Sequence, residues 1–182
     1  MPTIFNIASL LFLLALVPTA YAGLIGAPYA PTWNRAIRRG FARITLGPAD
    51  HLVDLGAGDG RTLIAAASRG AAATGYELSP VLWGIAAIRS LRYRRVKVKW
   101  RNFYKQTLPP DTTVVFVFLM PDHMQQIRRV LSRQTLPRGR RCLVYAFPFS
   151  GIKPLEVIKE PNCLPLYVYD LAKLTMQGDN EK

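Results

Sequence analysis

Residues 52–60 read LVDLGAGDG, and this stretch decides the fold. A short, mostly apolar run leads into Gly56, Gly58 and Gly60, and the helix-forming run RTLIAAA follows at 61–67. Because glycine lacks a Cβ, the chain can turn sharply there and a ligand can lie against the main chain. The pattern predicts a strand, a ligand-binding loop and a helix.

The spacing of the glycines distinguishes between ligands. A dinucleotide loop needs G-x-G-x-x-G, but Arg61 stands where its third glycine belongs. A phosphate loop needs a lysine that this stretch lacks. The motif is instead D-x-G-x-G-x-G, with Asp54 two positions before the first glycine. An acid there favours a ligand that is cationic or offers hydrogen-bond donors, whereas a glycine-rich turn beside an incidental acid is the alternative.

A second acid follows at the spacing of the next strand. Residues 72–77 read AATGYE, and Glu77 lies 21 residues after Gly56. In a Rossmann-like fold, an acid at the tip of the second strand binds ribose hydroxyls. Ser79 and Pro80 then provide an N-cap and a first-turn proline for another helix. Together, the two acids predict a cofactor that contains a nucleoside.

The composition bounds the class of protein. A chain of 182 residues with 50% hydrophobic content is sufficient for one domain with a core. There are 24 basic and 11 acidic residues, a net charge of +13, which leaves nucleic acid, anionic lipid and acidic proteins open as partners. Two cysteines, Cys142 and Cys163, are too few for a disulfide framework and favour a reducing compartment. No metal site is indicated.

Residues 1–34 carry no charged side chain. A membrane anchor at residues 1–27 is the favoured interpretation, because the first charges, Arg35, Arg38, Arg39 and Arg43, would stay in the cytoplasm. This predicts a membrane-anchored protein with its catalytic domain on the cytoplasmic side. A cleaved signal peptide with an A-x-A site at 20–22, lacking a basic n-region, and a buried core helix are the alternatives.

Residues 28–46 predict a basic amphipathic linker helix. Trp33, Ile37, Phe41 and Ile44 recur every three or four residues and share a face that we expect to pack on a core. The four arginines fall largely on the other face. We assign them to lipid phosphates, so an anionic lipid surface is an expected partner.

The remainder predicts alternating strands and helices. Residues 96–100 alternate, as in a strand with one wet face, whereas 113–119 are continuously apolar, as in a central strand. Strand 141–147 precedes a terminal hairpin of 156–160 and 164–172. Two helices should bury apolar faces, formed by Val81, Leu82, Ile85, Ile88 and Leu91 in one and by Met124, Ile127, Val130 and Leu131 in the helix at 121–133.

The expected fold class is α/β. It is a Rossmann-like fold whose mostly parallel, doubly wound sheet has an antiparallel terminal strand. An N-terminal hydrophobic helix precedes it. The main domain is expected at residues 47–175 and a polar tail at 176–182. The cofactor belongs at the carboxyl ends of the strands.

Several motifs resemble one family. They are YAPT at 29–32, VDLGAGDGR at 53–61, GYELSP at 75–80, LMP at 119–121 and YAFPF at 145–149. The chain is similar to the class I S-adenosylmethionine (SAM)-dependent protein lysine methyltransferases that modify the ATP synthase c-subunit and the adenine nucleotide translocase, and to their prokaryotic relatives. It departs from them at Trp33, where a second proline is usual, and at Asn102, where an aspartate is usual.

The resemblance implies that residues 47–175 form a SAM-dependent methyltransferase domain with the Rossmann-like class I methyltransferase fold. It also implies methyl transfer from SAM to a lysine ε-amine of a protein, with a membrane protein as the expected substrate. The expected cofactor-binding residues are Asp54, Gly56, Ala57, Gly58, Asp59, Gly60, Glu77, Leu78, Asn102, Phe103 and Leu119. Tyr29, Met120, Pro121 and Phe149 would line the substrate cleft. Asp122, His123 and Tyr29 are the catalytic candidates, although a lone histidine after a strand is more often structural, and Asn102 fits an ordinary loop equally well.

A nucleic-acid methyltransferase is the alternative that the charge of +13 encourages. Amino-group methylation of bases commonly uses [ND]-P-P-[YF] after the fourth strand, but residues 119–122 read LMPD. Methylation of cytosine C5 needs a nucleophilic cysteine, and Cys142 and Cys163 fall in an expected strand and hairpin. Both signatures are missing. Methylation of a small molecule or lipid stays open.

Overall fold

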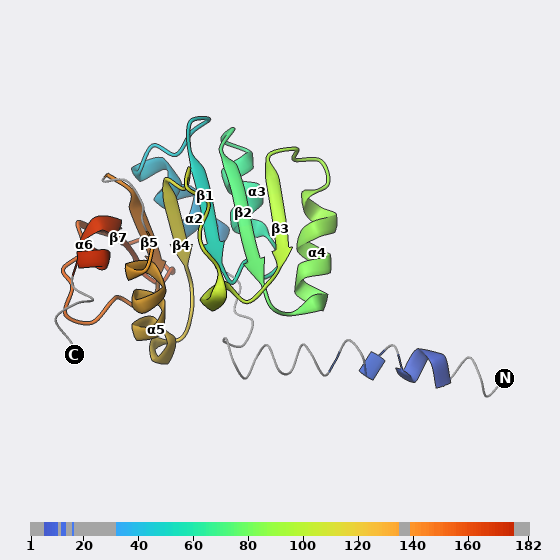
Figure 1. The fold of residues 1–182 in the computed structure, drawn as a ribbon. Coiled ribbons are helices and arrows are strands. Elements are labelled where there is room, and N and C mark those ends of the chain that lie inside the picture. Colours follow the sequence, from blue (N-terminus) through green and yellow to red (C-terminus); the bar gives the residue numbers. More distant parts are fainter. Residues whose placement is uncertain (1–5, 11, 14–15, 17–31, 135–138, 177–182) are drawn as a thin grey trace.

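A computed structural model describes residues 6–10, 12–13, 16, 32–134 and 139–176 (Figure 1). Its centre is a seven-stranded sheet in the order β3-β2-β1-β4-β5-β7-β6. The strands are β1 (His51–Leu55), β2 (Ala72–Glu77), β3 (Val96–Trp100), β4 (Val114–Val117), β5 (Arg141–Tyr145), β6 (Glu156–Ile158) and β7 (Leu166–Asp170).

The sheet confirms the predicted α/β class. Strands β1 to β5 run parallel to one another, whereas β7 runs antiparallel between β5 and β6. The predicted terminal hairpin is therefore present as β6 and β7. The strand order reverses between β1 and β4, and in open α/β sheets this switch point is where a ligand-binding crevice forms at the carboxyl ends.

Helices cover both faces of the sheet. The helices α2 (Asn34–Arg43) and α3 (Arg61–Ala67) pack on one face, in a core cluster that includes Ile37, Leu63 and Phe116. The 3-10 helix η1 (Phe103–Lys105) and the helix α5 (Pro121–Ser132) pack on the other, with Phe103, Ile127 and Leu131. Figure 1 shows α4 (Pro80–Ser90) at the β3 end of the sheet and α6 (Leu171–Met176) towards the opposite end.

Helix α2 confirms most of the predicted amphipathic pattern. Ile37 and Phe41 are buried and the four arginines are exposed. Gly40 makes this docking possible, because a Cβ there would overlap Leu166 Cδ2 of β7. Trp33 was expected on the buried face and is instead exposed. It is the N-cap residue with extended backbone, so it does not follow the helical periodicity.

The prediction of which face of α4 is buried is wrong. Val81, Ile85, Ile88 and Leu91 are exposed, and the buried positions of the helix are Ala86 and Ser90. The helix is apolar nearly all round, so periodicity could not indicate which face turns inward. The small side chains face inward, and Ala86 lies where a Cβ on Gly60 would make contact.

The predicted membrane anchor requires correction. Within the described ranges, no helix is long and apolar enough to cross a membrane. The expected N-terminal hydrophobic helix and the membrane-anchored localisation are therefore not supported. Most of residues 1–27 lies outside the described residues.

Candidate active site

The glycine loop connects β1 to α3. Gly56, Gly58 and Gly60 all adopt positive φ, at 96°, 56° and 78°, a region that side chains with a Cβ rarely occupy. The N–H groups of Gly56 and Ala57 both donate to the Tyr76 carbonyl of β2, at 3.0 and 2.9 Å. The three glycines thus let the main chain turn back against β2, which leaves a loop without bulky side chains at the switch point.

Asp54 lies near the end of β1 and is 2% exposed. Burial is the main cause that raises the pKa of this carboxyl to about 8; a hydrogen bond with Thr62 opposes the shift, and the negative charges of Glu77 and Asp59 add to it. A buried carboxyl of this kind ionises readily only when a positive charge approaches. The site therefore favours a cationic ligand.

Glu77 ends β2 and holds the glycine loop. Its Oε2 accepts a hydrogen bond from the Gly58 N–H at 2.8 Å. Its Oε1 accepts from the N–H groups of Leu78 and Ser79, at 2.9 and 2.8 Å. A carboxylate oxygen has a second lone pair, so Glu77 keeps capacity to accept from further donors, such as the ribose hydroxyls that the sequence predicts.

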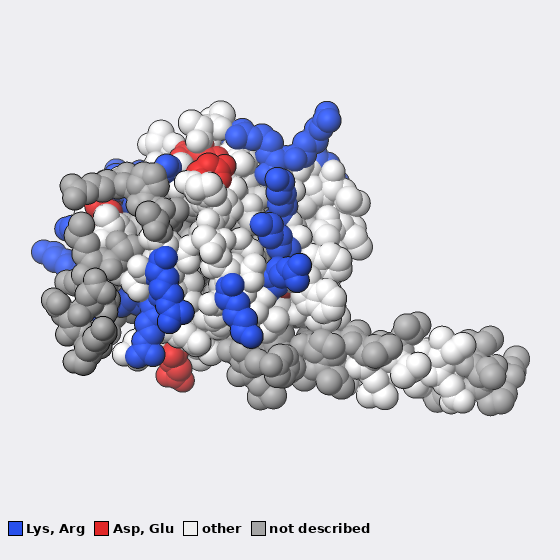
Figure 2. Space-filling model, viewed as in Figure 1, with Lys and Arg blue, Asp and Glu red and all other residues white. Residues whose placement is uncertain are grey.

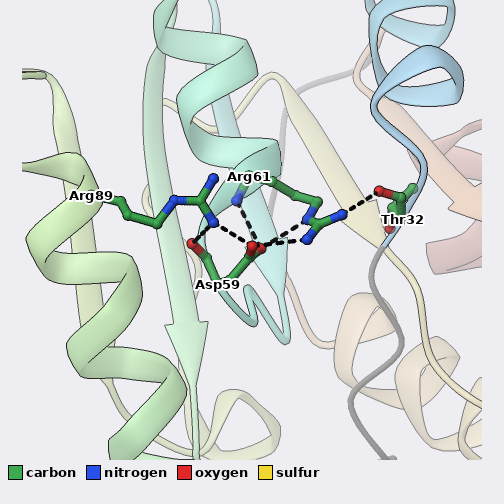
Figure 3. A network of polar contacts seen from close by, with 4 residues as sticks. All are labelled: Thr32, Asp59, Arg61 and Arg89. Carbon is green, nitrogen blue, oxygen red and sulfur yellow. Dashed lines mark hydrogen bonds and ion pairs between the residues drawn. The ribbon is translucent and has the colours of Figure 1, made fainter.

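Asp59 is held by two arginines (Figure 3). Arg61 Nε donates to Oδ1 at 2.9 Å and Arg61 Nη2 to Oδ2 at 2.9 Å. Arg89, from α4, donates to Oδ2 and to the Asp59 carbonyl. Partial burial alone would raise the pKa of Asp59, but the hydrogen bonds and charge of Arg61, with Arg89, outweigh it and lower the pKa. The side chain of Asp59 therefore holds the loop in place, and its predicted contact with the cofactor stays a prediction.

The same network extends to Thr32, in the segment that precedes α2. Arg61 Nη1 donates to the Thr32 carbonyl at 3.1 Å, so the glycine loop, α4 and the segment before α2 are connected (Figure 3). Sequence reasoning missed this role of Arg61 and Arg89. Arg61 follows the last glycine directly, which offered a signal, whereas Arg89 is 30 residues from Asp59 and offered none.

Residues after β3 and β4 meet at this edge of the sheet. Phe103 is buried, and the amide oxygen of Asn102 accepts from the Tyr104 N–H at 3.0 Å. Leu119 is buried with Cδ2 3.6 Å from the position of a Cβ on Gly56. Leu119 therefore lies against the glycine loop, while Asn102 caps η1 and keeps its amide N–H groups for other acceptors.

The predicted substrate-cleft residues differ in their surroundings. Met120 and Pro121 are exposed at the start of α5. Phe149 is buried against Tyr169, whose hydroxyl accepts from the Phe149 N–H at 3.0 Å. Tyr29, predicted both in the cleft and as a catalytic candidate, lies outside the described residues.

Of the two other catalytic candidates, His123 has a partner that the sequence did not indicate. Its Nδ1 lies 3.0 Å from Tyr104 Oη. Burial raises the pKa of Tyr104 to about 12, so this hydroxyl stays protonated at neutral pH. Asp122 is exposed in the first turn of α5. His123 and Tyr104 come from separate elements, 19 residues apart, so no motif could have paired them.

The family model of the ANTKMT methyltransferase domain matches residues 54–156, which include the glycine loop and β2 to β5. The rat lysine N-methyltransferase of the ATP synthase c-subunit is 31% identical over 83% of this chain and 69% of its own length. Mouse adenine nucleotide translocase lysine N-methyltransferase is 36% identical, over 63% and 51% respectively. A protein-lysine N-methyltransferase of Saccharolobus islandicus is 30% identical over 72% of this chain and 84% of its own length.

Solved structures agree with the fold. An RNA methyltransferase from Salinibacter ruber, in complex with S-adenosyl-L-homocysteine (SAH), superposes with a TM-score of 0.73 and 25% identity, over 78% of this chain and 94% of that chain. A SAM-dependent methyltransferase from Geobacter sulfurreducens with SAH gives 0.55 and 19%, over 68% and 52%. The second shows the fold alone. The chain therefore belongs to the ANTKMT methyltransferase domain family of SAM-dependent protein-lysine N-methyltransferases.

Proposed function

We propose that this chain transfers the methyl group of SAM to a lysine ε-amine of a membrane-embedded protein. The proposal is supported by the names of its relatives, which are lysine methyltransferases of the ATP synthase c-subunit and of adenine nucleotide translocase. The structural observation that carries it is the pair of acids, Asp54 and Glu77, on either side of a glycine loop with three positive φ angles.

The residues of this edge fit SAM by charge and shape. SAM supplies an electrophilic methyl group on a positively charged sulfonium. The Asp54 carboxyl, whose pKa is about 8, would ionise next to that cationic cofactor, and Glu77 would accept from the ribose hydroxyls. The absence of side chains on Gly56, Gly58 and Gly60 would let the cofactor lie against the main chain. Phe103 and Asn102 would contact the adenine.

The lysine must reach the site as a neutral amine. Its lone pair forms the new N–C bond while the S–C bond breaks, giving SAH and a methylated ammonium. A solvated lysine has a pKa of about 10.4, so transfer into an apolar cleft lined by Leu119, Met120 and Phe149 would favour loss of its proton. His123, aligned by Tyr104, is the candidate acceptor for that proton. Positioning accounts for the remaining catalysis.

Labelled SAM tests the proposal. The purified protein is incubated with methyl-labelled SAM and detergent-solubilised membrane proteins, and the products are hydrolysed to amino acids. We expect label in methyllysine. Gly56→Arg should abolish both SAM binding, measured by calorimetry, and labelling, because the added side chain would fill the loop next to Leu119. Label that appears only in RNA or lipid rejects the proposal.

Methylation of RNA is a second candidate, favoured by two observations. The Salinibacter ruber structure is that of an RNA methyltransferase. In addition, Figure 2 shows basic side chains along β3, where Lys97 and Lys99 are exposed on one face of the strand. The LMPD sequence at 119–122 opposes this candidate, because base amino-group methylation commonly uses a different signature. Total RNA as an added acceptor in the same assay decides between the two.

We also propose that α2 contacts the anionic lipid that surrounds such a substrate. Of the exposed arginines of α2, Arg39 and Arg43 pair with Glu160 and Glu156. Arg35 and Arg38 are the candidates for lipid phosphates. Arg35→Glu with Arg38→Glu should weaken sedimentation with vesicles containing phosphatidylglycerol and leave SAM binding unchanged. Equal sedimentation of variant and wild type would contradict the contact.

A further inference from the structure

The outer face of α4 is the largest departure from the expected burial pattern. Val81, Ile85, Ile88 and Leu91 are 43, 42, 71 and 81% exposed. A helix that is hydrophobic all round is normally buried on every side, and contiguous exposed apolar surface marks an interaction site more often than chance placement does. In the part of the chain that the structure describes, the inward face of α4 is buried and this outer stripe stays exposed.

The inward face of α4 is already packed against the rest of the domain. A rotation of the helix that buried the stripe would break those contacts. Ala86 packs next to Gly60 of the cofactor loop, and Ser90 is buried. Trp83 stacks on Trp100, with ring centroids 6.0 Å apart, and donates its indole N–H to the Val98 carbonyl. These contacts hold the helix with its aliphatic stripe outward.

The spacing of the stripe suits another helix. The four side chains recur at intervals of four, three and three residues, over about 15 Å of helix. This is the spacing of a seam between packed helices. Membrane-interface helices use tryptophans with their N–H groups turned to water. Here Trp83 and Trp100 donate those groups to the backbone carbonyls of Val98 and Leu78. The two tryptophans therefore do not match the pattern of a membrane-interface helix, and a protein helix suits the stripe better.

The charges around the stripe select the partner. Two exposed arginines, Arg92 and Arg94, follow Leu91 at the end of the stripe, and residues 81–110 contain no acid. A second copy of the chain would bring like charges together across the same stripe, which is destabilising. An acidic partner would be attracted.

We propose that the outer face of α4 binds an amphipathic helix of another protein, one that carries an aliphatic seam flanked by acidic side chains. The seam packs on Val81, Ile85, Ile88 and Leu91, and the acids face Arg92 and Arg94. Ile88 and Leu91, at the far end of the stripe, lie 11 and 14 residues after Glu77, and the proposal is independent of the identity of the methyl acceptor.

Two designed peptides test this interface. Both are 21-residue helices with leucine at every third or fourth position, one with glutamate and the other with lysine on the flanks. Binding to the full chain is measured by fluorescence anisotropy. We expect the glutamate peptide to bind and the lysine peptide to bind at least tenfold more weakly. Ile88→Glu with Leu91→Glu should abolish binding, and Arg92→Glu with Arg94→Glu should weaken it at least fivefold.

Leu164→Glu is the matched control, because Leu164 is also an exposed leucine but lies near β7, at the other end of the sheet. All variants should keep wild-type SAM affinity and circular dichroism. Equal binding of both peptides, or binding of neither, overturns the proposal. So does a dimer in sedimentation that Ile88→Glu with Leu91→Glu abolishes. Loss of binding to phosphatidylglycerol vesicles in that variant would assign the face to lipid and also overturn it.

Discussion

At the scale of single residues, the buried carboxyl of Asp54 gives the site its sensitivity to charge. It is shielded from water, and its pKa of about 8 means that it is largely protonated at neutral pH without a ligand. Binding of a cation shifts this equilibrium towards the ionised form. We therefore expect occupancy of the site by a cation to be coupled to the release of a proton.

This coupling predicts that SAM affinity rises between pH 6 and pH 8.5. Below the pKa of Asp54, binding must remove a proton, whereas above it the carboxylate is already charged. Calorimetry in buffers of different ionisation enthalpy should detect proton release at pH 7. Asp54→Asn should weaken SAM binding at pH 8.5 at least about tenfold, equivalent to about 1.4 kcal/mol, and remove most of the pH dependence. An unchanged pH profile in the variant would contradict the role of Asp54.

In the protein without SAM, the contribution of Asp54 to folding stability should fall as the pH rises, whereas SAM affinity should increase. Because the pKa of Asp54 is higher in the folded state than in the unfolded chain, its contribution is fully present below about pH 4 and is lost as the pH rises to about 8. Asp54→Asn carries no such cost. Its Tm should exceed that of the wild type by at least about 2–4 °C at pH 8.5, and the difference should shrink at pH 5. Scanning calorimetry at both values measures it.

At the scale of elements, α2 and α4 each contain one glycine, and the two have opposite requirements. A Cβ on Gly40 would overlap Leu166 Cδ2 and lie 3.3 Å from Leu143 Cδ2, so it would push α2 away from the sheet. Nothing lies within 4 Å of a Cβ on Gly84. The two positions form a matched pair for the same substitution.

Gly40→Ala should lower the free energy of unfolding by about 1–3 kcal/mol, the usual cost of overpacking a core. Gly84→Ala should raise it by about 0.4–1 kcal/mol, because alanine restricts the unfolded chain and favours helix. Urea unfolding followed by circular dichroism measures both. Leu166→Ala, combined with Gly40→Ala, should cost less than the sum of the two single changes. Simple additivity would show that the overlap is relieved elsewhere.

The arginines around Asp59 connect three elements, and this connection should matter for cofactor affinity. Arg89→Ala removes the polar contacts between α4 and Asp59 of the glycine loop. We expect the Kd for SAM to rise several-fold, with kcat at saturating SAM less affected, because the loop is then less well ordered before binding. Arg89→Lys should recover part of the affinity, since one donor remains. A normal Kd in Arg89→Ala would limit the network to a structural role.

At the scale of the whole molecule, the two cysteines report on different parts of the fold. Cys142 is buried in β5, in the middle of the sheet, and burial raises the pKa of its thiol, while Cys163 is partly exposed. The thiolate is the reactive form, so Cys142 should be inert in the folded protein. Its reactivity therefore measures global opening.

We expect an aryl disulfide reagent to modify one thiol rapidly in the native protein and the second only as urea unfolds the chain. The rate at Cys142 should follow the unfolding equilibrium when opening is rapid. Cys163→Ser, the control, should remove the rapid phase completely. Rapid modification of Cys142 without denaturant would mean that β5 opens locally, contrary to its central place in the sheet.

How well the sequence predicted burial differed between elements, and the difference has a physical reason. Residues 114–117 are apolar on both faces and α5 has a clear polar side, so composition and periodicity were enough to predict their burial. Helix α4 has apolar residues on every side, and there the buried face was predicted wrongly. In the absence of polar residues on one side, only the neighbouring elements decide which side is turned inward.

The sequence by itself determined the α/β class, the glycine loop with its two acids, and the family, because these depend on local spacing and on the backbone freedom of glycine. Only the tertiary structure decided that Arg89 holds Asp59, that Tyr104 meets His123, and that the aliphatic side of α4 faces outward. Each of these joins residues or elements that are far apart along the chain. Such contacts depend on how the elements pack against one another, and this packing cannot be predicted from the order of residues within one element.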